Sequence, residues 1–334
     1  MSASICFRAR RPRSGDPRVA MIVMLPIILV LLAAGIASAD LPPGVTRLSV
    51  SDAERSGSIV RLIPHAIGGS TLVDVMPPAS GMSLLAVSTD GGTVALTDRV
   101  GELSGSLTLA SDDGSQLRIT LPGLLATTFA PDGSWLAAID GRGALWRIDA
   151  TVGRSELIAE GPFIGSPLIA ADGSLLVLAV PSVEAPYQSR LVRVTPDAGD
   201  VSVLSDEELV YAAFPLDDGD LAAVAHDPGG TVVVRVGGDG ERRVADLGAG
   251  AVNVSVARDG RIAFEVVDEG IFLLDQPGSA PRGLGPGTRP CFAPDGSSVL
   301  VLRGQQRVAL SLEGSPLAWA DGQAAFAGSE GCLP

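Results

Sequence analysis

The stretch FAPDGSWLAAID, residues 129–140, places an Asp-Gly pair between two short apolar runs. A carboxylate at such a position fits a catalytic or metal-binding loop, or a tight turn between two strands. A proline presets φ for the turn, Asp132 can accept hydrogen bonds from nearby backbone N–H groups, and Gly133 can adopt the positive φ that closes it. We therefore interpret Asp132 as a turn residue and expect its loss to affect stability and not binding.

The same pattern of apolar run, Asp-Gly and apolar run recurs along the chain. The other copies are LLAVSTDGGTVALTD (84–98), LIAADGSLLVLAV (168–180), AFPLDDGDLAAVAHD (213–227), SVARDGRIAFEVVD (255–268) and CFAPDGSSVLVLRG (291–304). The turn aspartates are Asp90, Asp132, Asp172, Asp218, Asp259 and Asp295, at intervals of 42, 40, 46, 41 and 36 residues. A period of about 40 residues with several short strands per unit is typical of a β-propeller, whose blades are four-stranded sheets around an axis.

The second unit shows the four strands that one blade requires. LATTFA, SWLAAID, ALWRIDA and SELIA are separated by the turns PDG, GRG and TVGR. Beyond residue 40 helical periodicity is missing, and Gly and Pro punctuate the chain at close spacing, which favours short strands. The interval of 46 residues contains an insertion, PSVEAPYQS (181–189), which we expect to form a loop on one face of the ring.

The two ends of the chain are expected to share one blade. TRLSVSD (46–52), GSIVRLIP (57–64) and STLVDVM (70–76) precede the first Asp-Gly turn, and PLAWADGQAAFAG (316–328) follows the last one. A blade built from both ends removes the free edge that an open ring would expose. The sequence therefore predicts a single all-β domain, a β-propeller over residues 40–334 with about seven four-stranded blades, and six blades as the alternative.

FAPDGSWLA and CFAPDGSSVL resemble the Pro-Asp-Gly repeat of the WD40-like β-propellers of TolB type. Complete Pro-Asp-Gly triplets occur at residues 131–133 and 294–296, while the other four units keep Asp-Gly alone. The resemblance covers the propeller only, because residues 40–80 are too few and too strand-like to hold the α/β domain that precedes the propeller of TolB. No Trp-Asp dipeptide of true WD40 repeats occurs. The resemblance implies a propeller without a partner domain.

The first 39 residues predict an export signal. Five arginines and one aspartate lie in residues 1–19, a net charge of +4, so the total of −14 leaves −18 for the remainder. VAMIVMLPIILVLLAAGIASA (19–39) carries no charge and ends in small residues that fit a cleavage site after Ala39. The run is also long enough to span a bilayer as a signal anchor. Either way we expect the arginines to stay in the cytoplasm and the acidic domain to be extracytoplasmic. The domain would be secreted or periplasmic after cleavage, or it would be held in the membrane by residues 19–39.

Composition excludes several classes of function. A domain this acidic repels phosphate backbones, so nucleic acid is not an expected partner. Every residue in the Lys+Arg total of 24 is an arginine, which removes Schiff-base and phosphate-loop lysines.

Two of the three cysteines, Cys291 and Cys332, lie in the part predicted to be exported. Two thiols in an oxidising compartment can form a disulfide, and this one would tie the C-terminal tail to the last repeat. Two free buried thiols are the alternative.

Candidate catalytic residues are few. The only histidines are His65 and His226, and no Gly-x-Ser-x-Gly motif occurs. The strands expected to line the channel offer small and apolar side chains and one amide, Asn253; they are SLLAVS, LATTFA, SPLIAA, VYAAFP, VNVSVA and RPCFAP. Acidic turns such as SDDG (111–114) lack the alternating ligand spacing of a calcium loop. We assign no catalytic, cofactor-binding or metal-ligating residue and expect no cofactor.

These observations favour a non-catalytic extracytoplasmic module that binds a protein or another component of the cell envelope on one face of the ring. Two alternatives stay open. One is a propeller hydrolase or lactonase with its active site in the loops, and the other is a membrane-anchored sensor or accessory subunit. Fold alone does not imply function, so the partner has to be sought in the site.

Overall fold

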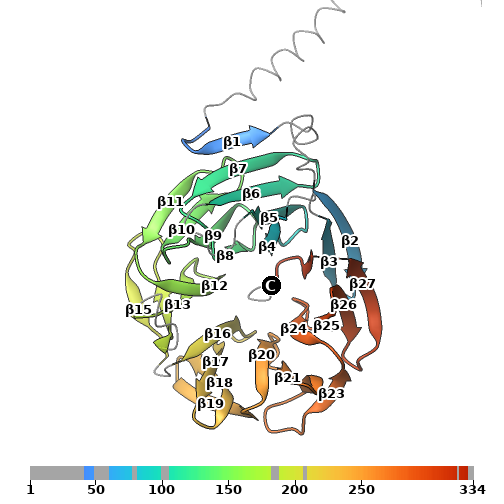
Figure 1. Ribbon diagram of the computed structural model, residues 1–334. Helices are drawn as coiled ribbons and strands as arrows, with labels where there is room; N and C mark the ends of the chain where they lie inside the picture. Colours follow the sequence, from blue (N-terminus) through green and yellow to red (C-terminus); the bar gives the residue numbers. More distant parts are fainter. Residues whose placement is uncertain are drawn as a thin grey trace, which may run out of the picture. The chain divides into compact units, whose positions relative to one another are not determined.

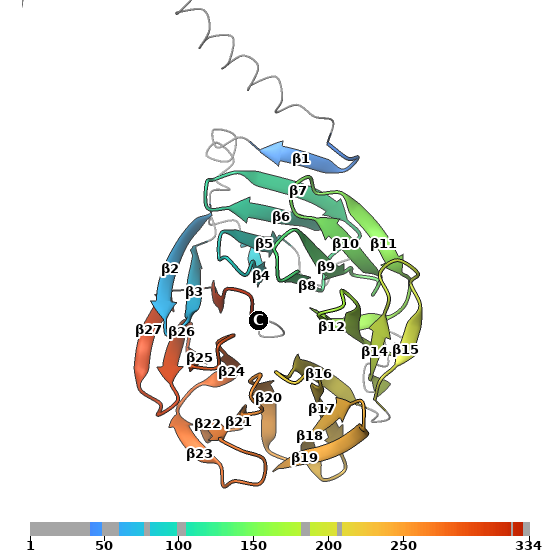
Figure 2. The same cartoon turned by 180° about the vertical axis from the view of Figure 1, so that it is seen from behind.

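The computed structural model describes residues 41–48, 60–76, 81–98, 105–181, 188–205, 209–321 and 323–329. The chain divides into two units after Leu41, of which the second, Pro42–Pro334, is compact. The second unit is a ring of seven β-sheets around a common axis (Figures 1 and 2). The export or anchor segment predicted over residues 1–39 lies outside the described residues. Within the described ranges, no helix is long and apolar enough to cross a membrane.

Six sheets follow the chain in order, each a meander whose first strand is innermost and whose last strand is farther out (Figure 1). Blade 1 contains β4 (Ser83–Val87), β5 (Thr93–Thr97), β6 (Gly105–Ser111) and β7 (Gln116–Leu121). Blade 2 contains β8 (Ala126–Phe129), β9 (Trp135–Ile139), β10 (Leu145–Asp149) and β11 (Ser155–Ala159). Blade 3 contains β12 (Phe163–Ile169), β13 (Leu175–Ala179), β14 (Arg190–Val194) and β15 (Val201–Val203).

The second half of the ring repeats this order. Blade 4 contains β16 (Val210–Pro215), β17 (Leu221–Asp227), β18 (Gly230–Gly237) and β19 (Gly240–Gly248). Blade 5 contains β20 (Ala251–Val256), β21 (Ile262–Val266), β22 (Gly270–Leu274) and β23 (Arg282–Gly285). Blade 6 contains β24 (Thr288–Phe292), β25 (Ser298–Arg303), β26 (Gln306–Ser311) and β27 (Pro316–Asp321). The six predicted repeat units are thus blades 1 to 6, and the prediction of seven blades is confirmed.

Blade 7 joins the two ends of the propeller. Its inner strand is the C-terminal β28 (Gln323–Phe326), which pairs antiparallel with β3 (Ser70–Met76), and β3 pairs with β2 (Arg61–Ile67). Blade 7 therefore has three strands within the described part of the chain, where the sequence predicted four. Because its strands come from opposite ends of the chain, the ring closes by strand pairing.

One predicted strand lies in a different blade. The segment TRLSVSD was expected in the shared blade, but β1 (Val45–Leu48) pairs with β7 as a fifth, outer strand of blade 1. Val45 packs against the core between blades 1 and 2. There it meets Gly153, where an added Cβ would lie 2.8 Å from Val45 Cγ1. Pairing with β7 thus makes β1 part of blade 1, and the contact with Gly153 joins it to blade 2. PLAWAD likewise forms β27 of blade 6 and not part of the shared blade.

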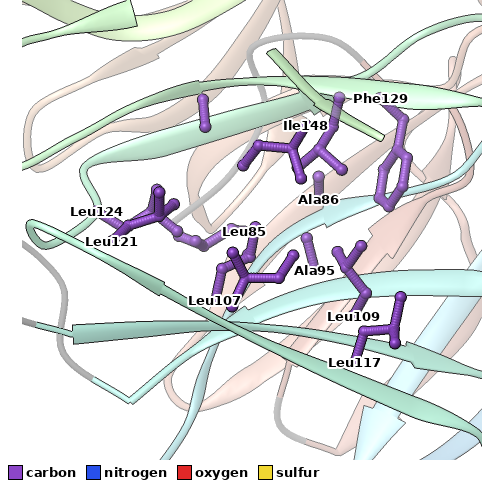
Figure 3. Packing of buried hydrophobic residues seen from close by; sticks show 13 residues of the cluster. Leu85, Ala86, Ala95, Leu107, Leu109, Leu117, Leu121, Leu124, Phe129 and Ile148 are labelled. Atoms are coloured by element: carbon purple, nitrogen blue, oxygen red, sulfur yellow. The ribbon is translucent and has the colours of Figure 1, made fainter. Parts of the chain in front are cut away.

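The hydrophobic core consists of separate clusters between neighbouring blades. Seven clusters occur among the described residues, one for each interface around the ring. Figure 3 shows the cluster between blades 1 and 2, where Leu107 and Leu109 lie on the side of blade 1 and Phe129 and Ile148 on the side of blade 2. Each sheet is buried on both faces, which explains the nearly continuous apolar runs in the inner strands.

Most inner strands carry a β-bulge. The register between the first and second strands shifts in blades 1, 3, 4, 5 and 6. Two of these irregular stretches contain a non-glycine residue with positive φ, Asn253 at 47° and Arg289 at 52°. A bulge redirects a side chain out of the regular alternation, so these two polar residues avoid the apolar faces of the sheets.

Candidate functional site

The six Asp-Gly turns connect the first and second strands of blades 1 to 6. In the turn of blade 2, Asp132 Oδ1 accepts hydrogen bonds from the Ser134 backbone N (3.1 Å) and Oγ (2.8 Å). Gly133 has φ of 70° and donates its N–H to the Ala130 carbonyl oxygen at 2.8 Å. The carboxylates of the other five turns likewise accept a backbone N–H two residues further along the chain. All six carboxylates therefore stabilise their own turns.

These hydrogen bonds stabilise the ionised form of the turn aspartates. The pKa of each of the six carboxyl groups lies below the ordinary aspartate value. For Asp132 the main cause is the backbone N–H of Ser134, and for Asp172 it is the hydroxyl of Ser174. For Asp295 burial raises the pKa, but the hydrogen bonds from Ser297 outweigh it. A proton donor or acceptor working near neutral pH needs the opposite shift, so the pKa values agree with a structural role.

A different aspartate of the opening stretch is buried. Asp140 is 1% exposed and directly follows strand β9. Its Oδ1 accepts the backbone N–H groups of Arg142 (2.8 Å) and Ala144 (2.9 Å), and its Oδ2 accepts the indole N–H of Trp146 at 2.9 Å. Three donors satisfy this carboxylate inside the turn between β9 and β10, so Asp140 is a structural residue that holds the second hairpin of blade 2.

The two histidines lie in different blades. His226 is at the end of β17, with its Nδ1 3.3 Å from the hydroxyl of Thr231, which also lies 2.7 Å from the Ala251 carbonyl oxygen. His65 lies in β2 of blade 7. Within the residues the structure describes, no group of three or more His, Cys, Asp or Glu side chains could hold a metal ion.

Cys291 lies in β24, is 2% exposed and forms a disulfide. Its predicted partner, Cys332, lies outside the described residues. The pairing of these two cysteines therefore stays a prediction.

A polar cluster lies on the inner strands of blades 5 and 6. Asn253 Nδ2 donates to Glu265 Oε2 at 2.7 Å, and the backbone N–H of Arg289 donates to the same oxygen at 3.0 Å. Asn253 is the single amide that the sequence placed on a channel strand, and the structure pairs it with a carboxylate from the neighbouring strand β21. One carboxylate oxygen thus bridges two adjacent blades.

An apolar recess lies between blades 4 and 5. This crevice has a volume of about 440 Å³ and draws its walls from β19, β21, β22 and the loop between β22 and β23. It is lined by Val244, Ala245, Asp246, Leu247, Phe264, Val266, Glu269, Phe272, Leu274, Gly278, Ser279 and Pro281. Small-molecule and side-chain sites are concave, mostly apolar and of this size. We take it as the candidate binding site and call it the blade 4/5 crevice.

Aromatic rings form part of the crevice wall, and carboxylates lie at its edge. The rings of Phe264 and Phe272 stack with centroids 5.9 Å apart and an interplanar angle of 25°. Phe264 is buried, whereas Phe272 is only partly buried and offers ring surface to an occupant. At the edge, Asp246 is paired with Arg243 at 2.9 Å, and Glu269 is exposed. The crevice therefore combines an apolar wall with a negatively charged border.

A second crevice of about 440 Å³ lies between blades 1 and 2 and has a polar lining. Thr93, Ser111, Ser115 and Thr151 contribute hydroxyl groups. Many of these groups already belong to the turns around them; for example, Asp113 accepts the backbone N–H of Ser115 at 2.8 Å. This crevice exposes more polar and less apolar surface than the blade 4/5 crevice, so we favour the blade 4/5 crevice.

Comparison with known proteins supports the fold. No protein-family model and no curated protein matches the chain. Among solved structures, TolB from Acinetobacter baumannii shares 18% identity, with 84% of this chain and 86% of TolB covered and a TM-score of 0.54. The chain has the fold of a TolB-type propeller. The resemblance drawn from the Pro-Asp-Gly repeats is thus confirmed at the level of the fold.

Other propellers superpose similarly well on this TolB-type ring. The tricorn protease shares 10% identity with a TM-score of 0.56, covering 87% of this chain but 36% of the protease. The β-propeller domain of Cps50 (Swd1) from Myceliophteria thermophila shares 13% identity with a TM-score of 0.51, covering 77% of this chain and 90% of that domain. Likeness at these identities establishes the fold, and the function has to be argued from this chain's own residues.

The sequence did not reveal the blade 4/5 crevice. Phe264 lies in the apolar run that follows the Asp259 turn, and the sequence pattern assigned no role to Phe272. The available signal was that both phenylalanines lie in one repeat unit, eight residues apart on either side of a hairpin turn. Strand pairing places them directly opposite each other, which periodicity alone does not show.

Proposed function

We propose that this protein is an extracytoplasmic binding module whose blade 4/5 crevice receives an apolar side chain of a partner protein. The observation that carries the proposal is the 440 Å³ crevice with the partly buried ring of Phe272 in its wall. A pocket of this volume fits one large aliphatic or aromatic anchor, and such anchors supply most of the binding energy at protein interfaces.

The negative charge at the border of the crevice indicates what kind of residue flanks the apolar side chain of the partner. Glu269 is exposed at the edge of the crevice, and the whole chain carries a net charge of −14. A cationic residue beside the apolar anchor would be attracted to this border, whereas an anionic one would be repelled. We therefore propose a partner segment in which a large apolar residue is flanked by Lys or Arg.

Defined synthetic peptides can test this binding. One peptide carries a single Phe flanked by lysines, and its control carries the same Phe flanked by glutamates. We expect the purified full chain to bind the lysine peptide more tightly in a fluorescence-anisotropy titration. Phe272→Ala should raise the Kd about tenfold, because it removes ring surface from the crevice wall. Glu269→Lys should raise the Kd for the lysine peptide and lower the Kd for the glutamate peptide.

A matched control separates the crevice from general surface apolarity. Leu317 on β27 is 50% exposed and lies in blade 6, so Leu317→Ala should leave the Kd unchanged. Thermal unfolding of every variant shows whether the fold is retained. Equal affinity for the two peptides, or an unchanged Kd in a folded Phe272→Ala variant, would contradict the proposal. Hydrolysis of a lactone by the purified chain would instead favour the hydrolase alternative.

The extracytoplasmic location is part of the same proposal and rests on the charge and apolarity of residues 1–39. N-terminal sequencing of the protein recovered from cells can test it. A chain that starts at Asp40 and fractionates outside the cytoplasm would support cleavage after Ala39. An intact N-terminus in the membrane fraction would support the anchor, and an intact chain in the cytoplasm would contradict both.

A further inference from the structure

Arg307 on β26 is unusual for a charged side chain because it is 6% exposed, and it is the one buried arginine among the described residues. Arginine is rarely buried unless its charge is paired, since removing a guanidinium from water is costly. Arg307 is therefore a positive charge buried in blade 6, and such a charge needs an anionic partner.

The described part of the protein supplies no such counterpart. Arg307 makes no hydrogen bond or ion pair with the residues that the structure describes, whereas Arg235 and Arg282 each bind aspartates. Burial lowers the pKa of the Arg307 guanidinium, and the nearby positive charge of Arg289 lowers it further. An arginine nevertheless stays protonated, so Arg307 is a buried positive charge beside a second one.

Strand register brings Arg289 to the same end of the blade. Arg307 pairs with Leu302 of β25, and Leu302 pairs with Thr288 of β24, the residue before Arg289. The positive φ of Arg289 lies in the bulge of that inner strand. Its backbone N–H donates to Glu265, and its guanidinium donates to no carboxylate in the described ranges. Arg289 is exposed and follows the residue in register with Arg307, and its positive charge acts on the Arg307 guanidinium. Within the described ranges no carboxylate binds either guanidinium.

On the β27 side, the neighbours of Arg307 are small side chains. By strand alternation Arg307 shares a face of β26 with Ala309, which packs toward blade 7 in a cluster with Leu72. Its cross-strand neighbour on β27 is Ala320, and Ala309 pairs with Ala318. Alanines on this face leave the guanidinium with no large side chain of β27 beside it.

We propose that Arg307 and Arg289 form a binding site for an oxyanion, the carboxylate or phosphate group of a small ligand, at the interface of blades 6 and 7. The planar guanidinium matches both groups with two parallel N–H donors, and such charge-assisted hydrogen bonds are strong where water is excluded. The site lies on other blades than the blade 4/5 crevice, so the two proposals can fail independently.

Thermal unfolding of the full chain tests the site with two probes, inorganic phosphate and succinate, against chloride at equal ionic strength. A ligand that binds only the folded state raises Tm in a saturable way, here by roughly 2–5 °C. Saturable stabilisation by phosphate, by succinate or by both is the expected result and identifies the preferred group. Stabilisation no larger than that of chloride would overturn the proposal.

Substitutions locate the effect. Arg307→Met should abolish the anion-dependent rise in Tm, and Arg289→Gln should raise the Kd about tenfold. Arg154→Gln removes an exposed arginine of blade 2 and should leave the anion-dependent rise in Tm unchanged. An unchanged anion response in Arg307→Met would contradict the site.

A second measurement separates a ligand-binding arginine from a structural one. In buffer without oxyanions, Arg307→Met should be at least as stable as the parent, because an apolar side chain of similar length replaces a buried charge that has no partner in the described part of the chain. A lower Tm of Arg307→Met under these conditions would show that Arg307 is paired within the protein, and would overturn the proposal.

Discussion

Two aspartates of the stretch FAPDGSWLAAID have different environments and therefore contribute differently to the free energy of unfolding. Asp132 lies at the exposed tip of a turn and binds donors that water could replace. Asp140 is buried and binds three donors, including the indole of Trp146. Removing a buried acceptor leaves its donors without partners, whereas removing an exposed one lets water take its place.

Asp140→Ala is therefore expected to reduce the free energy of unfolding by about 3 kcal/mol. Asp132→Ala is the matched control from the same hairpin and should cost clearly less. Urea unfolding monitored by tryptophan fluorescence can measure both, because Trp146 reports on the loss of its own hydrogen bond. Equal losses in the two variants would contradict this account of Asp140.

The turn carboxylates also predict how stability depends on pH. Their pKa values are lower in the folded state than the ordinary value near 4, so the folded chain binds fewer protons than the unfolded chain in that range. This contribution is fully present above about pH 4 and is lost as the pH falls through the folded-state pKa values. We expect Tm to be nearly constant from about pH 6 to pH 5 and to fall below about pH 4. Serine-to-alanine changes at Ser134 and Ser174 should weaken this dependence.

At the scale of elements, blade 7 differs from the other blades because its strands are far apart in the chain. β28 contributes the inner strand, and Phe326 within it is fully buried against blade 6. The backbone of the same strand pairs with β3, and Gln323 Nε2 also donates to the Met82 carbonyl oxygen of blade 1 at 2.6 Å. One strand of four residues thus connects three blades.

Phe326→Ala should lower the free energy of unfolding by about 4 kcal/mol, because it creates a cavity in the core between blades 6 and 7. Hydrogen exchange should show that residues 70–76 lose protection first, since β3 depends on β28. Phe264→Ala in blade 5 removes a similarly buried ring and is the control. It should cost a comparable free energy without early exchange of residues 70–76. Uniform exchange in both variants would show that β28 does not hold the ring closed.

The whole molecule is a closed ring in which every blade contributes to two apolar clusters, and this ring carries a large negative charge. Ion pairs such as Arg235 with Asp218 and Asp220, and Arg282 with Asp275, lie at partly exposed positions. Exposed pairs contribute between 0 and about 1 kcal/mol each, whereas a net charge of −14 repels itself across the entire surface. The repulsion between negative charges should therefore destabilise the fold by more than the ion pairs stabilise it.

Added salt is expected to stabilise the protein for this reason. Raising NaCl from about 0.05 M to about 0.5 M screens the long-range repulsion and should raise Tm by a few degrees. Differential scanning calorimetry at constant pH can measure the change. A fall in Tm with salt would mean that the ion pairs dominate the electrostatic free energy.

What the sequence determined by itself was local and repeated. The Asp-Gly turns, the four strands of each unit and the six repeat units depend on turn geometry and alternation within about ten residues. Six blades stayed an alternative to seven, because the seventh blade pairs strands from opposite ends of the chain. Only the tertiary structure decided the pairings between distant segments. β28 and β3 are some 250 residues apart, and β1 pairs with β7 of blade 1. Phe264, Phe272 and Arg307 acquired their environments from neighbouring strands and blades. Register and burial decide such contacts, and neither is encoded in the spacing of residues along one strand.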